Sequence, residues 1–276
     1  MMNNSMIGAM VTMSSAQQRL DMIANNVANV NTVGFKKDEG SFQDVLSRVQ
    51  QQPETYRQTG RAMPLGYNLG FGVKMASMTK DLEQGSMLET GNPTDLAIVG
   101  NALFAIDANG EKAWTRNGGF SFVPDPANPQ GNEVLLVTAD GHRVLDRTGN
   151  EITAPVGSKV AIDEQGRVII RIEGEEDYSL QEIQFVNVQR YQGLELRDGN
   201  MFVLGTGVTE DDVFGAGAAA TIPDNAKIRQ GVLEQSNVNL TEEMTTMLQT
   251  QRMYQMASRA LTSSDTMMGL ANSLRA

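Results

Sequence analysis

The feature that most constrains this chain is a pair of heptad-spaced apolar series, one near each end. Two interleaved series at the N-terminal end run through Met6, Met13, Leu20 and Val27, and through Ala9, Ala16, Ile23 and Val30. The series at the C-terminal end runs through Leu240, Met247, Tyr254, Leu261 and Met268. A sustained seven-residue repeat is typical of a helix that packs on other helices along one stripe. The pattern predicts helices over residues 4–31 and 239–274, about 42 Å and 54 Å long at about 1.5 Å per residue.

Both predicted helices have recognisable ends. Asn25, Asn26 and Asn29 are poor helix formers because their side chains compete for backbone groups, so they favour termination of the first helix. We expect Gly34 to supply a left-handed cap, Phe35 to pack back, and the two following lysines to face the negative end of the helix dipole. At the other end, Asn239 or Thr241 is a candidate N-cap, followed by two glutamates in the first turn.

The termini share a composition that the middle lacks. Twelve of the 17 methionines lie in residues 1–22 and 244–268. Residues 1–37 have a net charge of +2, and residues 238–276 have a net charge of zero. The net charge of −11 therefore comes entirely from the middle. Methionine adapts to irregular gaps, which suits packing against repeated partners, although a plain Met-rich core has the same periodicity. The polar face of the first helix is nearly uncharged, which favours contact with neighbours.

Composition excludes several classes of function. An acidic chain with a pI near 4.6 argues against nucleic acid as the main partner, because a phosphate backbone requires a basic face. The absence of cysteine excludes disulfides, thiol nucleophiles and cysteine-ligated metals, and the single His142 excludes a His-His metal pair. No window reaches the ~18 consecutive apolar residues of a membrane span. The first residues lack the basic region of a cleavable signal peptide, so membrane insertion and a cleaved leader are not expected.

Between residues 82 and 222 the pattern changes to short β-branched or alternating runs separated by Asn-Gly, Asp-Gly and Gln-Gly pairs, which predicts strands joined by tight turns. The predicted fold class is therefore α+β, with long coiled-coil-type helices at both termini enclosing a mainly β middle domain. The expected organisation is an N-terminal helix over 1–35, an extended connector over 36–81, a β-rich domain over 82–222, a return connector over 223–237 and a C-terminal helix over 238–276. The two ends pair, and the middle protrudes.

The run from Ala24 to Lys37, which reads Ala-Asn-Asn-Val-Ala-Asn-Val-Asn-Thr-Val-Gly-Phe-Lys-Lys, resembles the N-terminal signature of the bacterial flagellar rod and hook proteins. Further blocks of this resemblance follow in family order at 91–98, 114–118, 136–142 and 236–244, and Asn237 belongs to the last of them. The segment 69–73 is similar to the distal rod protein, and Ser236–Asn239 also resembles proximal rod and hook-basal body paralogues. One departure is the run Gly100-Asn101-Ala102-Leu103-Phe104, where the family usually has a Gly-Phe-Phe element. Another is an extra Pro-rich stretch over 124–129, which interrupts a predicted hairpin.

The resemblance implies a non-enzymatic structural subunit of the flagellar basal body, without cofactors, that polymerises into the helical shaft transmitting motor torque. It implies as partners other copies of the chain, other rod and hook proteins, and the flagellar type III export apparatus. We expect the heptad residues to form the assembly seam with neighbouring subunits. A hook subunit is the first alternative, and an envelope carbohydrate-binding or lytic module is the second.

Sequence motifs for chemistry are weak. The chain lacks a Gly-x-Ser-x-Gly elbow and a phosphate-binding loop, and Asp107-Ala108-Asn109-Gly110 lacks the remaining ligands of a calcium loop, so it is interpreted as a turn. We expect His142 at a hairpin tip rather than as a general base. The single Trp114 could stack on a sugar, but the resemblance makes it part of the β fold. Two of the 33 acidic residues could form a glycosidase pair, yet nothing in the sequence selects one.

Overall fold

The computed structural model describes residues 2–44, 48–51, 66–69, 73–125, 132–171, 178–197, 200–215, 217 and 226–274. The chain divides into two compact units. Unit 1 comprises Met1–Ala28, Asp38–Asp81 and Asn239–Ala276, and unit 2 comprises Asn29–Lys37 and Leu82–Val238. The prediction of a helix at each end and a mostly β middle is confirmed.

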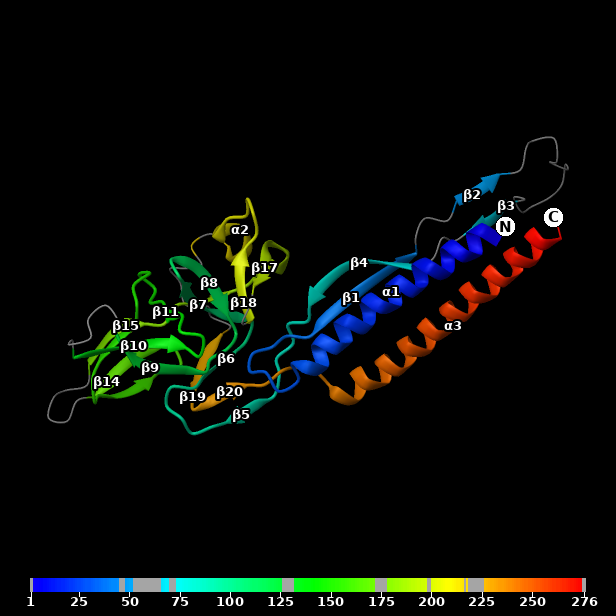
Figure 1. Cartoon of the computed structure of the whole chain (residues 1–276). Helices are drawn as coiled ribbons and strands as arrows, with labels where there is room; N and C mark the ends of the chain where they lie inside the picture. The colour runs from blue at the N-terminus through cyan, green and yellow to red at the C-terminus, as the bar shows by residue number, and fades with distance from the viewer. Residues whose placement is uncertain are drawn as a thin grey trace, which may run out of the picture. The chain divides into compact units, whose positions relative to one another are not determined.

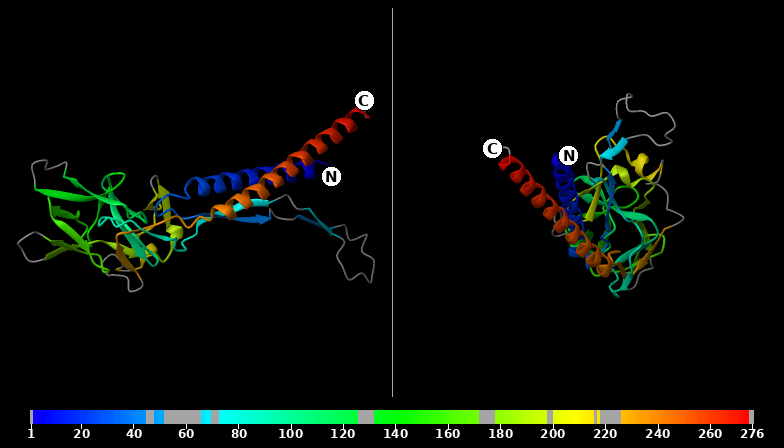
Figure 2. Two further views of the ribbon diagram at one scale, coloured as in Figure 1. Left: turned by 90° about the horizontal axis from the view of Figure 1, so that it is seen from below. Right: turned by 90° about the vertical axis from the view of Figure 1, so that its right-hand side faces the viewer.

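Two long helices dominate unit 1. Helix α1 spans Met2–Ala28 and helix α3 spans Leu240–Ser273. They lie side by side and antiparallel, with both chain termini at the same end (Figures 1 and 2). Asn239 caps α3, since its side-chain oxygen accepts a hydrogen bond from the amide of Thr241 at 3.1 Å, so of the two predicted N-cap candidates the structure selects Asn239.

The segment 36–81, expected to be an extended connector, contains paired strands in its described part. Strand β1 (Asp38–Asp44) pairs antiparallel with β4 (Val73–Lys80), and β2 (Arg48–Gln51) pairs antiparallel with β3 (Gly66–Leu69). The first pair contacts α1 and forms a two-stranded ribbon beside it (Figure 1). Residues 45–47, 52–65 and 70–72 of this segment lie outside the described residues.

Unit 2 is built from antiparallel strands. Its largest sheet has nine strands, in the order β12-β10-β11-β7-β8-β18-β17, with β16 added to β7 and β9 added to β10. A three-stranded sheet has the order β13-β14-β15, and two further pairs are β6 with β19 and β5 with β20. The short helices α2 (Glu210–Phe214) and η2 (Tyr191–Gly193) connect strands.

The strand bounds of unit 2 are as follows: β5 Met87–Glu89, β6 Leu96–Val99, β7 Ala102–Ala108, β8 Glu111–Thr115, β9 Phe120–Pro124, β10 Glu133–Thr138, β11 Arg143–Val144, β12 Thr153–Pro155, β13 Lys159–Ile162, β14 Arg167–Arg171, β15 Tyr178–Glu182, β16 Phe185–Asn187, β17 Leu194–Arg197, β18 Met201–Leu204, β19 Lys227–Gln230 and β20 Val232–Glu234. The expected return connector over 223–237 thus contains two strands of unit 2. The Pro-rich positions 126–131 lie outside the described residues.

Strand β7 separates two apolar cores. Its alternating side chains Phe104 and Ile106 belong to one cluster, and Leu103 and Ala105 belong to the other. Successive side chains of a strand point to opposite faces, so a strand that is apolar at every position is buried on both sides. The run Ala102–Ile106 has this composition, and each of its side chains is at most 2% exposed.

Of the predicted turn pairs, Asn-Gly at 109–110, Asp-Gly at 140–141 and Gln-Gly at 165–166 connect paired antiparallel strands, and Asp-Gly at 198–199 lies outside the described residues. Asn109 and Gly110, with φ of 59° and 89°, connect β7 to β8, as a two-residue hairpin requires. Among the described residues, no helix is both long and apolar enough to span a membrane.

Candidate assembly helices and buried polar clusters

The predicted seam residues of α1 lie on its covered side. Ile23 is completely buried, whereas Met6, Met13, Leu20 and Val27 are half-buried. The last member of the series, Val30, follows the end of the helix, belongs to unit 2 and is half-buried. The N-terminal heptad pattern therefore marks the covered side of α1, but the helix ends earlier than residue 31.

The predicted seam residues of α3 are partly covered within the subunit. Met247, Tyr254, Leu261 and Met268 are half-buried, and Leu240 is 40% exposed. The most buried positions of α3 are a different series, also spaced by seven, formed by Glu243, Thr250 and Ala257 at 4%, 0% and 8% exposure. The hydroxyl of Thr250 donates to the carbonyl of Thr246 at 2.7 Å, which satisfies it without another side chain. The apolar signal missed this series because two of its three members are polar.

A second stripe of α3 is exposed along its whole length. Steps of three or four residues keep side chains on one helix face. Nine residues on such steps are all exposed, the last of them directly after the end of the helix: Met244, Leu248, Arg252, Met256, Arg259, Ser263, Met267, Leu270 and Leu274. We name these nine residues the α3 stripe. Its methionine and leucine side chains are between 50% and 88% exposed. Helix α3 thus has one apolar side against α1 and another with no cover in the described part of the chain.

A buried polar cluster explains two of the signature asparagines. The side chain of Asn26 is fully buried and pairs with the backbone of Asp38 in both directions: Oδ1 accepts from the amide at 2.8 Å, and Nδ2 donates to the carbonyl at 3.0 Å. Asn25 Nδ2 donates to a carboxylate oxygen of Asp38 at 2.9 Å, and Lys80 Nζ lies 2.7 Å from the other oxygen. Asn26 Nδ2 also lies 3.5 Å from Glu243 Oε2. These five residues, the Asp38 cluster, connect α1, β1, β4 and α3 within unit 1.

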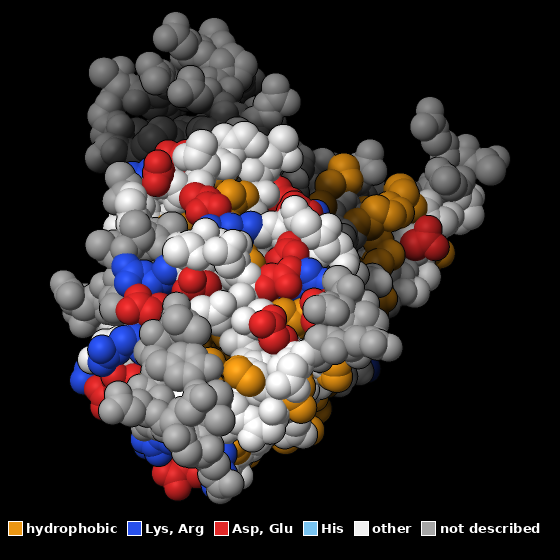
Figure 3. Space-filling view, turned by 90° about the vertical axis from the view of Figure 1, so that its left-hand side faces the viewer, with side chains coloured by type: hydrophobic (Ala, Val, Ile, Leu, Met, Phe, Trp, Pro, Cys, Tyr) orange, Lys and Arg blue, Asp and Glu red, His pale blue; other side chains and the backbone are white. Residues whose placement is uncertain are grey.

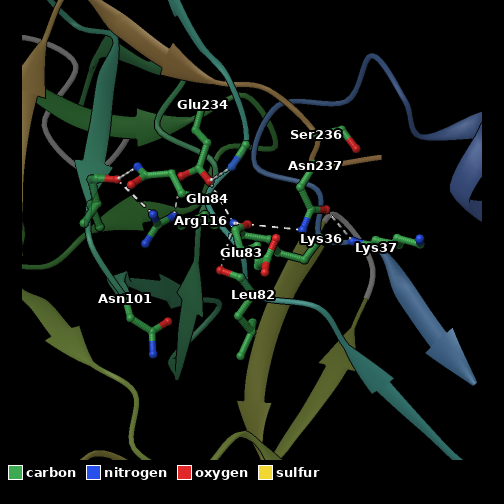
Figure 4. Close-up of polar contacts among 12 residues, drawn as sticks. Lys36, Lys37, Leu82, Glu83, Gln84, Asn101, Arg116, Glu234, Ser236 and Asn237 are labelled. Atoms are coloured by element: carbon green, nitrogen blue, oxygen red, sulfur yellow. Dashed lines mark hydrogen bonds and ion pairs between the residues drawn. The ribbon is translucent and has the colours of Figure 1, made fainter. Parts of the chain in front are cut away.

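Unit 2 contains a second buried cluster, centred on Glu234 (Figure 4). Its carboxylate accepts hydrogen bonds from Lys36 Nζ at 2.8 Å, from Arg116 Nε at 2.6 Å and from the amide of Gly85 at 3.0 Å. The three charged side chains are at most 5% exposed. We name Lys36, Arg116 and Glu234 the Glu234 cluster.

Backbone carbonyls balance the excess positive charge of the Glu234 cluster. Lys36 Nζ also donates to the carbonyl of Glu83 at 2.7 Å. Arg116 donates to the carbonyl of Ile98 at 2.9 Å and to that of Ala102. A buried charge is tolerated only when it is paired and its remaining donors are satisfied. The geometry meets both conditions, so the cluster is a fixed junction rather than a reactive group.

The electrostatic state of Glu234 follows from opposing influences. Burial, the largest of them, raises the pKa of Glu234, but the charge of Arg116, the hydrogen bond and charge of Lys36, and the amide of Gly85 together lower the pKa below its ordinary value. Nearby, burial raises the pKa of Tyr191, whose hydroxyl donates to Asn101 Oδ1 at 2.9 Å. Glu234 is therefore ionised and acts as the anion that holds two cations.

The signature segment approaches this cluster closely. The amide of Gly34 donates to the carbonyl of Glu234 at 2.9 Å, and a Cβ on Gly34 would lie 2.7 Å from the backbone of Arg116. Its φ of +69° is the expected left-handed conformation, but α1 ends six residues earlier, so Gly34 is not the helix cap. Phe35 is buried at 3% exposure. The expectation that Lys36 faces the helix dipole is wrong, because its ammonium is bound to Glu234.

Asn237 contacts two other segments of unit 2 that lie next to a boundary with unit 1 in the sequence. Its side-chain oxygen accepts from the amide of Lys37 at 2.8 Å, and its amide nitrogen donates to the carbonyl of Glu83 at 3.2 Å. Residues near 37, 83 and 237 are thereby held together within unit 2 (Figure 4). Asn29 belongs to the turn after α1, where its carbonyl accepts from the amide of Thr32 at 3.1 Å.

Sequence reasoning missed Asp38, Arg116 and Glu234. One signal was available for Glu234: it lies two residues after buried Val232 in β20, and alternate residues of a strand share a face. An acidic residue at an inward position predicts a buried cationic partner. Its two partners, Lys36 and Arg116, are more than a hundred residues away in the sequence, and no local pattern identifies them.

The residues considered for catalysis or ligand binding have structural roles. His142 lies in the turn between β10 and β11, as expected, and its carbonyl accepts from the amide of Thr138. Trp114 is completely buried, with its ring 4.8 Å from that of Phe214, so it cannot stack on a sugar. Asp107 Oδ1 accepts from the amide of Gly110, which makes this segment a turn. In the described ranges, no group of three or more His, Asp or Glu side chains is arranged to hold a metal ion.

The surface of unit 2 carries mixed charges. Figure 3, a view onto this unit, shows acidic and basic side chains interspersed with scattered apolar ones. Several form exposed ion pairs, such as Arg197 with Glu111 and Lys227 with Glu164. Exposed pairs of this kind contribute little to stability.

Comparisons with known proteins agree with this architecture. A model described as flagella basal body rod protein matches residues 8–36, and one described as flagellar basal body rod FlgEFG protein C-terminal matches residues 229–274. The chain is similar to the flagellar basal-body rod protein FlgG of Borreliella burgdorferi, with 34% identity and 95% of each chain covered. It is also similar to the flagellar hook-basal body complex protein FlhP of Bacillus subtilis, with 31% identity over 99% of this chain and 100% of the relative. FlgG of Caulobacter vibrioides is 33% identical, with 95% and 96% covered.

Proposed function

The chain belongs to the flagellar basal-body rod protein family, and we propose that it acts as a structural rod subunit that polymerises through α1 and α3. This family is structural rather than enzymatic, and its members are components of the flagellum. Polymerisation of this chain would form the helical shaft that carries motor torque.

The exposed α3 stripe is the observation that carries this proposal. Five of its residues, Met244, Leu248, Met256, Met267 and Leu270, are 50–65% exposed. A row of large apolar side chains left in water is unfavourable, at about 25 cal/mol for each Å² of apolar surface, and such rows mark protein–protein interfaces. In a filament every subunit covers this surface with its neighbours, so assembly removes the cost.

The two buried polar clusters support a role under mechanical load. The Glu234 cluster and Asn237 fasten the crossing points of the chain within unit 2, and the Asp38 cluster fastens α1, α3 and the ribbon within unit 1. Satisfied buried polar networks make a structure rigid because any displacement leaves a charge unpaired. Rigid junctions of this kind suit a subunit that transmits torque.

We also propose where in the flagellar axis the subunit lies. The relatives include FlgG rod proteins and the hook-basal body protein FlhP, which favours a distal rod or hook-basal body subunit over a hook subunit. We further propose that the flagellar type III export apparatus delivers the chain. The alternative of a lytic or carbohydrate-binding envelope module has no support from buried Trp114.

A substitution in the α3 stripe tests the proposal. Leu248→Glu places a charge on the exposed apolar face, so it should leave the free subunit folded but prevent rod formation. Gln251→Glu adds the same charge to an exposed position of α3 outside the stripe and should leave rods intact. Secreted subunit is measured separately, to distinguish export from assembly. Normal motility of the Leu248→Glu strain, with the variant subunit present in its rods, contradicts the proposal.

A deletion strain tests the position. Loss of a rod subunit removes everything assembled beyond it, whereas loss of a hook subunit leaves a complete rod. Electron microscopy of purified basal bodies distinguishes the two results. A complete rod in the deletion strain contradicts the assignment to the rod and supports the hook alternative.

A further inference from the structure

Helix α1 also has an exposed stripe, separate from its covered seam. At alternating steps of three and four residues, all of the following side chains are exposed: Ile7, Met10, Ser14, Gln17, Asp21, Ala24 and Ala28. We name these seven residues the α1 stripe. It is apolar near its start, with Ile7 and Met10 at 40% and 46% exposure, and small near its end.

The charges of the two stripes are complementary. Asp21 is the single charged residue of the α1 stripe, and Arg252 and Arg259 are the charged residues of the α3 stripe. None of these three side chains forms an ion pair with another described residue. The α1 stripe therefore presents one acidic side chain, and the α3 stripe presents two basic side chains, each within an otherwise uncharged row.

We propose that the α3 stripe of one copy packs on the α1 stripe of a second copy, with Asp21 opposite Arg259 setting the register. This inference rests on the proposed function, since it names the surfaces through which rod subunits meet. Copies along a filament all point the same way, so α1 of one copy and α3 of the next run antiparallel, as they do within one chain.

The proposed register aligns the rest of both stripes. Met10 lies eleven residues before Asp21, and Leu270 lies eleven residues after Arg259. In antiparallel helices these equal separations, about 16 Å at about 1.5 Å per residue, place Met10 beside Leu270. In the other direction, Ala24 lies beside Met256, where a small side chain leaves room for a long one.

Contact between two different stripes also matches an open assembly. An interface that joins unlike surfaces is heterologous, and when it does not close into a ring it generates a helical filament. Two α3 stripes facing each other would instead form a closed dimer and bring arginines together. The opposite charges therefore favour the heterologous arrangement.

Charge reversal tests the register. Asp21→Arg puts three cations at the contact and Arg259→Asp leaves two acids there, so each single variant should lose rods and swimming. The double variant Asp21→Arg with Arg259→Asp restores an opposite pair and should restore rods. Asp140→Arg, a reversal at an exposed turn of unit 2, is the control that should remain motile. Motile single variants, or a double variant as defective as the singles, overturn the inference.

Cross-linking tests the arrangement directly, because the chain contains no native cysteine. With Ala24→Cys and Met256→Cys in one chain, oxidation of assembled rods should produce a ladder of covalent multimers in a denaturing gel, since Cβ atoms within about 4.5 Å can form a disulfide. Each single-cysteine variant is the control and should remain monomeric. Dimers alone indicate a closed pairing, and internally cross-linked monomers indicate contact within one chain; either result overturns the inference.

These variants distinguish a wrong register from a wrong function. If Leu248→Glu prevents assembly while the charge reversals do not, the rod function stands and the Asp21–Arg259 register is wrong. If Leu248→Glu also leaves rods intact, the proposed use of α3 is itself wrong.

Discussion

At the scale of single residues, the short stretch from Asn26 to Asp38 contributes buried polar side chains to both clusters. Asn26 replaces a missing backbone partner for Asp38, and Lys36, ten residues later, is bound to Glu234. The first contact spans 12 residues of sequence, and the second joins segments 198 residues apart. Removing one partner of a buried charged group leaves the other uncompensated, which is more costly than losing the contact alone.

Glu234→Gln should destabilise unit 2 by about 3–5 kcal/mol near neutral pH, because Lys36 and Arg116 would remain buried without an anion. Urea unfolding measured by fluorescence provides the test, since the single Trp114 lies in a core of unit 2. Glu234→Ala should be at least as damaging. A loss below about 1 kcal/mol, typical of surface positions, contradicts a structural role for the cluster.

The lowered pKa of Glu234 predicts that the unfolding free energy depends on pH. The pKa of Glu234 is lower in the folded chain than its ordinary value of 4.5. The stabilisation it provides is therefore complete above pH 4.5 and is lost as the pH falls through the lower folded-state pKa. Between about pH 6 and about pH 3, wild-type protein should lose more unfolding free energy than Glu234→Gln, which cannot titrate there. Parallel losses in both proteins argue against this linkage.

Gly34→Ala combines a left-handed φ with a close approach to the backbone of Arg116. Gly207→Ala is a matched control, with a φ of +84° and nothing within 4 Å of the added Cβ. The control should cost about 1–2 kcal/mol from the backbone conformation alone. Gly34→Ala should cost clearly more by urea unfolding, and equal losses would show that the close approach relaxes without cost.

At the scale of elements, each long helix has a covered side and an exposed side. Ile23 and Ala257 are buried within unit 1, whereas the α1 and α3 stripes are exposed. The heptad pattern alone does not separate these roles, because both stripes repeat at steps of three and four. The contacts within the subunit decide which apolar residues remain for a neighbour.

Two isoleucine truncations in α1 separate these roles. Ile23→Ala removes a fully buried side chain and should destabilise unit 1 by about 2–5 kcal/mol. Ile7→Ala removes the same atoms from a 40% exposed position and should cost less than about 0.5 kcal/mol in the free subunit. Thermal unfolding monitored by the helical circular dichroism signal compares them. Equal shifts would mean that the exposed stripe is covered in the free subunit.

At the scale of the whole molecule, the two units differ in how completely their apolar side chains are buried. The centre of β7 in unit 2 is 0–2% exposed, whereas most seam residues of α1 and α3 are only half-buried. Local opening requires less free energy where few apolar side chains are covered. We therefore expect unit 2 to be the more stable of the two units in a free subunit.

Hydrogen exchange of the dilute subunit should reflect this difference. Amides of α1 and α3 should exchange faster than those of β7, β8 and β10, and the helices should gain protection on assembly into rods. Mass spectrometry of peptides from each element provides the measurement. Equal protection of helices and sheet in the free subunit contradicts the expectation that the helices await their neighbours.

Much of the local structure was readable from the sequence. The heptad series predicted both helices, and the Asn-Gly and Asp-Gly pairs predicted hairpin turns such as that at Asn109 and Gly110. These predictions depend on side-chain period and on allowed φ values, which are properties of neighbouring residues. The predicted helix over 4–31 is too long at its C-terminal end for the same reason. Val30 continues the apolar series, although α1 ends at Ala28.

Only the tertiary structure decided which distant residues meet. Lys36, Arg116 and Glu234 are three of 22 basic and 33 acidic residues, and nothing local in the sequence pairs them. The same is true of Glu243, Thr250 and Ala257, whose mixed polarity hides a buried heptad. Periodicity follows from backbone geometry within a few residues, whereas burial and charge pairing depend on which segments the topology brings together. The sequence by itself therefore determined the two long helices, the β-rich middle and the family, and the tertiary structure determined the strands within the expected connectors, the junctions and the surfaces left free for assembly.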